Sequence, residues 1–226
     1  MTTATLSTQN LVKTFIQEST EITVLKDVTT QFRQGSTYAI TGNSGAGKST
    51  LLHMLAGLEE PTSGTVLFND HSLSTMSEHE KNTWLNRSVG ILFQQPYLIK
   101  ELSVLENVML KGLIAGMPYV ECAHKARVLL GKVGLIDKSD SRTTALSGGQ
   151  QARIALARAL FMEPLFLLAD EPTGNLDEQT AQVIIELLLE CQQLWHMGLI
   201  VSSHDAYVAN RMQATLRLQN GLLRAE

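Results

Sequence analysis

The sequence predicts an α/β protein whose core is a mixed, mostly parallel β-sheet with helices on its faces. Short apolar runs of strand character alternate with segments of helical periodicity, a pattern typical of strands joined by helices. The run PLFLLADEP at residues 164–172 is apolar almost without a break, as expected for a strand covered on both faces. From about residue 95 to residue 146 the strand signals stop, which indicates a helical lobe inserted into the core.

The elements are predicted from local signals along the chain. Strands are expected where short apolar runs meet turn residues, at residues 37–41, 65–70, 88–93, 164–172 and 198–203. Helices are expected where apolar residues recur at helical spacing, at residues 48–58, 77–87, 104–116, 120–134 and 177–195. Residues 214–225 (ATLRLQNGLLRA) predict a hairpin near the C-terminus.

Capping residues predict where several helices begin. Ser77 with Glu80, and Ser103 with Glu106, have the three-residue spacing of a capping box. Asp177 is suited to cap the long helix that follows it.

The whole chain, residues 1–226, is interpreted as a single domain. Its core, with an N-terminal β part, is placed at residues 1–94 and 147–226, and its helical lobe at about residues 95–146.

The composition is that of an ordinary globular chain and sets limits on its partners. The chain has 226 residues, 44% of them hydrophobic, and a formal net charge of −4. This mildly acidic balance argues against broad nucleic-acid binding, so no nucleic-acid partner is expected. Cys122 and Cys191 lack metal-ligand spacing and are expected to be free thiols in a reducing compartment. Since neither a signal peptide nor a membrane span is predicted, membrane association is expected to come through a partner.

A phosphate-binding loop is predicted at residues 42–49, where GNSGAGKS matches G-x-x-x-x-G-K-[ST]. Its glycines permit positive φ angles, so that the N–H groups from Gly45 to Thr50 can point at phosphates. Lys48 would reach the β- and γ-phosphates, and the Ser49 hydroxyl would bind Mg²⁺. A glycine-rich turn with an incidental lysine is disfavoured because the loop follows a strand and opens a helix. The predicted nucleotide-binding residues are Gly42, Asn43, Ser44, Gly45, Ala46, Gly47, Lys48, Ser49 and Thr50.

Two acids narrow the choice among kinases, GTPases, helicases and transport ATPases. Asp170 and Glu171 end an apolar strand, at the edge where α/β sheets bind ligands. Asp170 fits the acid that holds Mg²⁺, and Glu171 is suited to orient or deprotonate the attacking water. A GTPase would also be expected to carry an N-K-x-D motif, which this sequence lacks.

A second glycine motif, LSGGQQ, follows the predicted lobe and opens another helix. A helix N-terminus offers N–H groups to an anion, although a cap that serves only this chain would look the same. The motif resembles the signature of ATP-binding-cassette (ABC) ATPases, and this resemblance extends from about Leu11 to Gly221. In that family two cassettes pair head to tail, and each signature contacts the ATP that the other cassette binds. The resemblance thus implies contacts to a second copy's ATP from Ser147, Gly148, Gly149 and Gln150.

Further family positions are carried over one at a time. Gln94 resembles the glutamine that touches Mg²⁺ and water, although Gln95 beside it makes a shift of one residue possible. His204 resembles the histidine that contacts the γ-phosphate, and Phe15 falls where an aromatic residue stacks on adenine. A structural histidine and a core phenylalanine are the alternatives. The segment GNLD resembles the D-loop of the dimer interface, with the residues Asn175, Leu176 and Asp177.

Within the ABC family, three segments resemble the group that holds the lipoprotein-releasing, macrolide-exporter and cell-division cassettes. They are STLLHMLAGLEEPTSGTV (49–66), LSVLENVML (102–110) and ADEPTGNLD (169–177). The resemblance implies a Mg²⁺-dependent ATPase, most similar to those of lipoprotein release. A division-type cassette that regulates cell-wall hydrolysis without transport, or macrolide-exporter-like export of another substrate, remains the alternative.

The same resemblance implies partners and a location. The chain would pair with a second copy of itself and with integral membrane permease subunits that have periplasmic domains. It would lie on the cytoplasmic face of the bacterial inner membrane, bound through those subunits. Tyr97, Leu98 and Ile99 are expected to be exposed and to meet the membrane partner, unless they pack inside the lobe.

Overall fold

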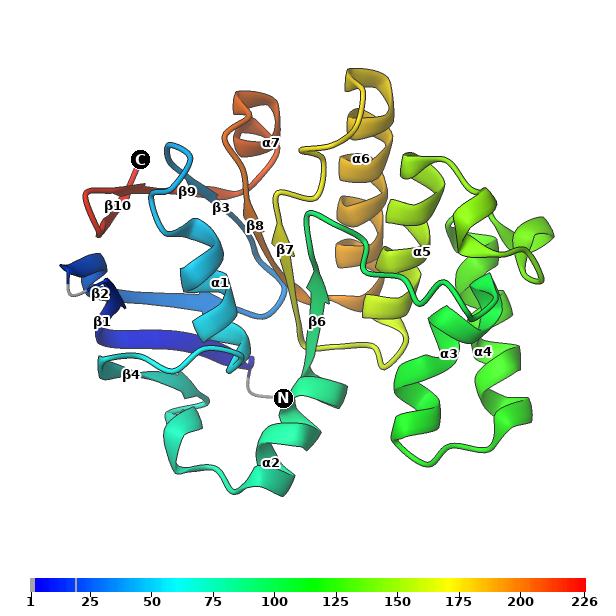
Figure 1. Cartoon of the computed structure of the whole chain (residues 1–226), viewed down its shortest axis with the longest axis horizontal. Helices are drawn as coiled ribbons and strands as arrows, with labels where there is room; N and C mark the ends of the chain where they lie inside the picture. The colour runs from blue at the N-terminus through cyan, green and yellow to red at the C-terminus, as the bar shows by residue number, and fades with distance from the viewer. Residues whose placement is uncertain (1–2, 19) are drawn as a thin grey trace.

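A computed structural model describes residues 3–18 and 20–226, and its core is the predicted α/β fold with two β-sheets (Figure 1). The larger sheet has six strands in the order β10-β9-β3-β8-β7-β6. These strands are β3 (Thr37–Thr41), β6 (Val89–Leu92), β7 (Phe166–Asp170), β8 (Gly198–Ser202), β9 (Ala214–Gln219) and β10 (Leu222–Ala225). All neighbours in this sheet pair in parallel except β9 and β10, which form the predicted antiparallel hairpin.

The smaller sheet is antiparallel and has the order β2-β1-β4-β5. Its strands are β1 (Thr5–Gln17), β2 (Thr20–Arg33), β4 (Ser63–Phe68) and β5 (His71–Ser72). The sequence predicts a strand in the region of β4 and an N-terminal β part, but it does not separate β1 from β2. The pairing of β4 with β1, which builds the sheet, joins segments too distant in the chain for a local pattern to reveal.

Seven α-helices are found among the described residues. They are α1 (Lys48–Ala56), α2 (Glu78–Thr83), α3 (Val104–Ile114), α4 (Tyr119–Lys132), α5 (Gly148–Leu160), α6 (Glu178–Trp195) and α7 (Ala206–Asn210). The predicted helices are all present, and both predicted capping boxes form, at Ser77–Glu80 and Ser103–Glu106. The short α7 was not predicted. In the part of the chain that the structure describes, no helix is long and apolar enough to cross a membrane.

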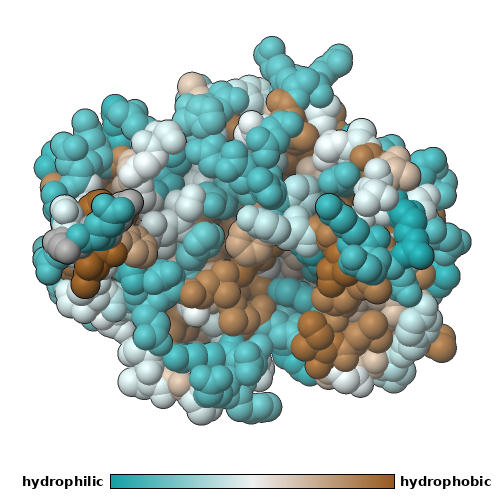
Figure 2. All heavy atoms as spheres, in the orientation of Figure 1, coloured by the Kyte–Doolittle hydropathy of each residue, from teal (hydrophilic) through white to brown (hydrophobic). Residues whose placement is uncertain are grey.

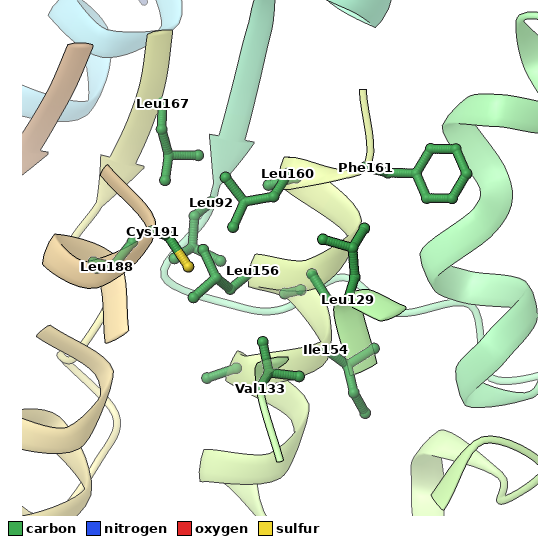
Figure 3. Packing of buried hydrophobic residues seen from close by; sticks show 14 of the residues in the cluster. Leu92, Leu129, Val133, Ile154, Leu156, Leu160, Phe161, Leu167, Leu188 and Cys191 are labelled. Carbon is green, nitrogen blue, oxygen red and sulfur yellow. The ribbon is translucent and has the colours of Figure 1, made fainter. Parts of the chain in front are cut away.

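Helix α5 lies between the larger sheet and the lobe helices α3 and α4 (Figure 1). Figure 1 shows α3 and α4 on the side of α5 that faces away from β6 and β7. Leu156 and Leu160 of α5 share one buried cluster with Leu167 of β7, Leu188 of α6 and other core residues (Figure 3). A second cluster packs α1 and the smaller sheet on the other face of the larger sheet. Residues 95–146, all of them described, contain no strand, and they reach the core mainly through α5.

A half-buried lysine, whose ammonium points inward, links the lobe to the core. The Lys111 ammonium, on α3, donates to the carbonyl oxygens of Leu85 at 3.1 Å and Val89 at 2.8 Å. Burial lowers the pKa of Lys111 to about 8, and the nearby charge of Arg158 acts in the same direction. A neutral amine can still donate both bonds, so deprotonation removes the cost of a buried charge while the contacts stay.

We predict that this lysine makes the protein's stability depend on pH. Between about pH 8 and 10.5 the unfolded chain keeps a proton that folded Lys111 has lost, so its contribution to stability rises with pH. Below pH 8 Lys111 is protonated in both the folded and the unfolded chain. Its contribution to the free energy of unfolding then stays at its least favourable value. The free energy of unfolding of the parent, relative to Lys111→Met, should rise by up to about 3 kcal/mol over this interval, since one pKa unit corresponds to about 1.4 kcal/mol. Denaturant unfolding of both chains from pH 7 to 10 measures it, and a pH-independent difference would contradict the assignment.

Candidate nucleotide site

The predicted phosphate loop connects β3 to α1 at the carboxyl edge of the larger sheet. Gly47 caps α1 with a φ of 101°, and a Cβ there would lie 2.5 Å from Cγ1 of Val24, so only glycine fits. The Lys48 ammonium folds back over the loop and donates to the carbonyl oxygens of Gly42 at 2.9 Å and Asn43 at 3.3 Å. These two hydrogen bonds hold the Lys48 side chain against the backbone of the loop.

Asp170 lies under this loop, at the end of β7. It is buried, and its Oδ1 accepts a hydrogen bond from the Ser49 hydroxyl at 2.9 Å. One hydroxyl beside one carboxylate suits Mg²⁺, a hard cation that prefers oxygen ligands and keeps several of them from water and phosphate. No cluster of three His, Cys, Asp or Glu side chains able to hold a metal occurs in residues 3–18 and 20–226. Ser49 and Asp170 supply oxygen donors that fit Mg²⁺, and Gln94 lines the cleft to which Ser49 also belongs.

Glu171 adopts an unusual backbone conformation that directs its carboxylate into the site. Its φ is 44°, a left-handed value that is uncommon outside glycine, and its N–H donates to the Ser202 carbonyl at 3.1 Å. The carboxylate lies 3.2 Å from the Lys48 ammonium and 2.7 Å from Nδ1 of His204. Lys48 and Glu171 are largely buried, whereas two thirds of the His204 side chain is exposed.

Lys48, Ser49, Glu171 and His204 line one open cleft of about 1150 Å³, whereas the buried Asp170 is not part of its lining. Its walls include most of the predicted catalytic and loop residues: Gly42, Asn43, Ser44, Gly45, Gly47, Lys48, Ser49, Thr50, Gln94, Glu171 and His204. Ala46 instead lines an adjoining cavity of about 450 Å³. Gln94 belongs to the lining and Gln95 does not, so the geometry favours Gln94 as the residue at the cleft.

Phe15, on β1, is not among the residues that line this cleft. It lines neither the cleft nor the adjoining cavity, and its side chain is 39% exposed, with the Lys13 ammonium 4.8 Å from the centre of its ring. Its neighbour across the β1–β2 pair, Ile22, does line the adjoining cavity, together with Val24. An adenine contact by Phe15 therefore stays a prediction from the family resemblance.

The second glycine motif starts α5 and does not line the cleft. Ser147 caps the helix: its hydroxyl accepts from the Gln150 N–H at 3.3 Å, and Oε1 of Gln150 accepts from the Ser147 N–H at 3.0 Å. Ser147 and Gly148 are exposed. In Figure 1 the helices α1, α5 and α6 all run downward from their first residues, and α5 lies on the other side of β7 from α1.

The predicted D-loop connects the cleft to this motif. Nδ2 of Asn175 donates to the carbonyl oxygen of Gln94 at 3.4 Å, and Leu176 packs beside Gly148. Asp177 caps α6 and accepts hydrogen bonds from the Thr180 N–H at 2.9 Å and the Thr180 hydroxyl at 2.7 Å. These bonds hold the pKa of Asp177 below its ordinary value.

Sequence analysis missed Ser202 and Arg158 as residues that support the site. Ser202 bonds to both Asp170 and Glu171, and Arg158 of α5 donates to the carbonyl oxygens of Pro96 at 2.6 Å and Tyr97 at 2.8 Å. The serine pair before His204 was a local signal for the first. No local pattern reveals the second, because its partners lie about 60 residues away.

The approach of the signature helix to α6 leads to a testable prediction. A Cβ on Gly149 would lie 2.5 Å from Cγ2 of Thr180, so Gly149→Ala should destabilise the fold by about 1–3 kcal/mol through overpacking. Thr180→Ser removes that methyl group but keeps the hydroxyl that bonds Asp177, and should relieve most of the penalty. Chemical denaturation of the two single variants and the double variant measures the coupling. Strictly additive effects would show that the two residues are not in contact.

Comparisons with known proteins agree with this geometry. Residues 25–174 match the family model for ABC transporters. The chain is 44% identical to the lipoprotein-releasing system ATP-binding protein LolD of Syntrophus aciditrophicus, over 96% of this chain and 97% of the relative. It is 39% identical to the LolD protein of Idiomarina loihiensis, over 100% of this chain and 99% of the relative.

A solved structure is similar over almost the whole chain. The ATP-binding cassette MJ0796, in a dimeric post-hydrolysis state bound to ADP and Pi, superposes with a TM-score of 0.90 at 32% identity, covering 98% of this chain and 97% of the other. The chain belongs to the ABC transporter family, as one of its ATPase cassettes.

Proposed function

We propose that this chain hydrolyses ATP at sites shared between two copies of itself. Closure of the two copies on ATP would drive membrane subunits that release lipoproteins from the inner membrane. The observation that carries the catalytic part is the position of the Glu171 carboxylate, between Lys48 and His204 and directly after the buried Asp170. A carboxylate so placed can take a proton from a water that attacks the γ-phosphate.

Each side chain of the cleft has a separate part in the proposed reaction. The N–H groups of the phosphate loop and the Lys48 ammonium bind the phosphates, with Lys48 exchanging its carbonyl and Glu171 contacts for phosphate oxygens. Ser49, Asp170 and Gln94 would hold Mg²⁺, which neutralises negative charge on the phosphates when bound. Glu171 accepts the proton of the attacking water, and His204 fixes the Glu171 carboxylate and contacts the γ-phosphate.

The signature motif is proposed to complete the site of the second copy. Ser147, Gly148 and Gly149 present a hydroxyl and two N–H groups at the start of a 13-residue helix, without lysine of their own. Within one chain they do not line the cleft that holds Lys48. A head-to-tail dimer would bring them to the partner's nucleotide, and the similar cassette MJ0796 is dimeric.

Lipoprotein release is proposed because LolD proteins match nearly the full length of the chain. The partners would then be integral membrane permease subunits with periplasmic domains, and the chain would lie peripherally on the cytoplasmic face of the bacterial inner membrane. Of the three residues expected to meet them, Tyr97 and Ile99 are 64% and 39% exposed. The expectation for Leu98 was wrong, because it is half-buried and packs against the core cluster.

The proposed docking surface consists of Tyr97, Ile99 and the lobe residues Leu113 and Ile114, all of which are exposed. Figure 2 shows apolar side chains gathered over the middle of this face and over the lobe. Arg158 fixes the backbone at Pro96 and Tyr97, so the segment after Gln94 is held to the signature helix. A membrane subunit bound here would therefore contact the part of the chain that links the cleft to α5.

We predict that Glu171→Gln keeps ATP binding but lowers turnover at least 100-fold, as expected when a general base is removed. A dimer locked by ATP should accumulate. Phosphate release, nucleotide binding and size-exclusion chromatography with ATP measure the three effects. Glu190→Gln, an exposed acid on α6, is the control and should behave as the parent does. Turnover in Glu171→Gln close to that of the parent would remove Glu171 from the mechanism.

The locked variant also tests the proposed transport role. Tagged Glu171→Gln protein is recovered from native membranes in mild detergent with ATP, and its partners are identified by mass spectrometry. Two related membrane proteins with large periplasmic domains, together with lipoproteins, are expected. Tyr97→Asp should weaken this recovery, whereas Leu194→Asp, an equally exposed apolar site on α6, should not. A single membrane partner with cell-wall factors, or no membrane partner, would contradict lipoprotein release.

A further inference from the structure

Ser202 occupies a buried position between the two acids of the site. It is the last residue of β8 and pairs in register with Asp170 of β7 and with Ile40 of β3. Its residue surface is fully buried. Neighbouring residues on parallel strands point to the same face of a sheet, so the Ser202 hydroxyl faces the Asp170 carboxylate.

The hydroxyl makes two hydrogen bonds of opposite direction. It donates to Oδ1 of Asp170 at 2.6 Å, and it accepts from the Glu171 N–H at 3.0 Å. An ionised carboxylate only accepts and a backbone N–H only donates, so both directions are fixed by chemistry. One hydroxyl thus joins the acid proposed to hold Mg²⁺ to the backbone of the residue proposed as the base.

We propose that Ser202 is a positioning residue for the metal and water chemistry of this cassette. The inference rests on the proposed function of Asp170 and Glu171. Asp170 receives both of its described side-chain hydrogen bonds, from Ser49 and Ser202, on Oδ1. This arrangement fixes the carboxylate rotamer and leaves Oδ2 without a described side-chain hydrogen bond, so that it is the oxygen proposed to contact the metal.

The same residue stabilises the strained backbone of Glu171. A φ of 44° in a glutamate persists only where its surroundings hold it, and such strain is common at functional sites. The Glu171 N–H is shared between the hydroxyl and the carbonyl oxygen of Ser202, at 3.0 and 3.1 Å. Loss of the hydroxyl therefore loosens the backbone turn that directs the Glu171 carboxylate to Lys48 and His204.

The adjacent serine provides a matched control. Ser203 is also buried, but its hydroxyl accepts from the Asp205 N–H at 3.0 Å and has no hydrogen bond to Asp170 or Glu171. Ser203→Ala removes the same atom from the same part of the chain. It thereby separates a specific effect of Ser202 from the general cost of deleting a buried hydroxyl.

The test measures Mg²⁺ dependence separately from nucleotide affinity. Binding of a fluorescent, non-hydrolysable ATP analogue is titrated with Mg²⁺ and repeated in EDTA, and ATP turnover is measured in parallel. Ser202→Ala should raise the Mg²⁺ concentration for half-maximal binding about fivefold and lower kcat about tenfold, in line with loss of a hydrogen bond to a charged group. Affinity in EDTA should stay within about twofold of the parent. Ser202→Thr should recover both quantities, and Ser203→Ala should match the parent.

The outcomes separate this inference from the proposed function. If Ser202→Ala binds Mg²⁺ and turns over as the parent does, or loses affinity equally with and without Mg²⁺, Ser202 has no positioning role. If the parent itself shows no Mg²⁺-dependent binding, the proposed nucleotide site is wrong. Should Ser202→Ala not fold, Ser202→Cys keeps a comparable volume with a weaker donor and should show the same Mg²⁺-specific loss.

Discussion

The parallel register of β3, β8 and β7 is the constraint on which the site depends. Neighbouring parallel strands end at the same edge of the sheet. The residues that directly follow them are therefore close together without long connecting loops. β3 leads into the loop that carries Lys48, β8 ends at Ser202 just before His204, and β7 ends at Asp170 before Glu171. The apolar strands are buried on both faces, which makes this edge rigid.

Helix α5 connects this edge of the sheet to the helical lobe. Its first residues form the signature motif, its middle packs against the sheet, α3 and α4, and its last turn carries Arg158 to the backbone of Pro96 and Tyr97. The segment after Gln94 is thus bonded to the same helix that is proposed to face the partner's nucleotide. A continuous set of packed and hydrogen-bonded elements of this kind can carry coupling between a nucleotide site and a membrane partner.

Local sequence patterns predicted the parts of the molecule that local chemistry determines. The phosphate loop, the caps at Ser77, Ser103 and Asp177, and the C-terminal hairpin depend on neighbours within a few residues, and all have the predicted form. The apolar run before Asp170 was enough to predict a buried strand, and it is one.

What sequence analysis missed depends on contacts between distant segments. The pairing of β1 with β4, the burial of Leu98 and the bonds of Ser202 and Arg158 arise only when the chain is folded. Phe15 is not part of the cleft lining in this structure, and its contact with adenine stays a prediction from the family resemblance.

Each complete site is proposed to take its phosphate loop from one copy and its signature from the other. Two variants are each expected to be inactive alone. Ser147→Arg blocks the signature motif with a bulky side chain, and Lys48→Ala removes the lysine that is proposed to bind the phosphates. ATP turnover is then measured in an equal mixture of the two. If half of the dimers are mixed and each has one complete site of two, activity should return to at most about a quarter of the parent value. No activity in a mixture proven to contain mixed dimers would contradict shared sites.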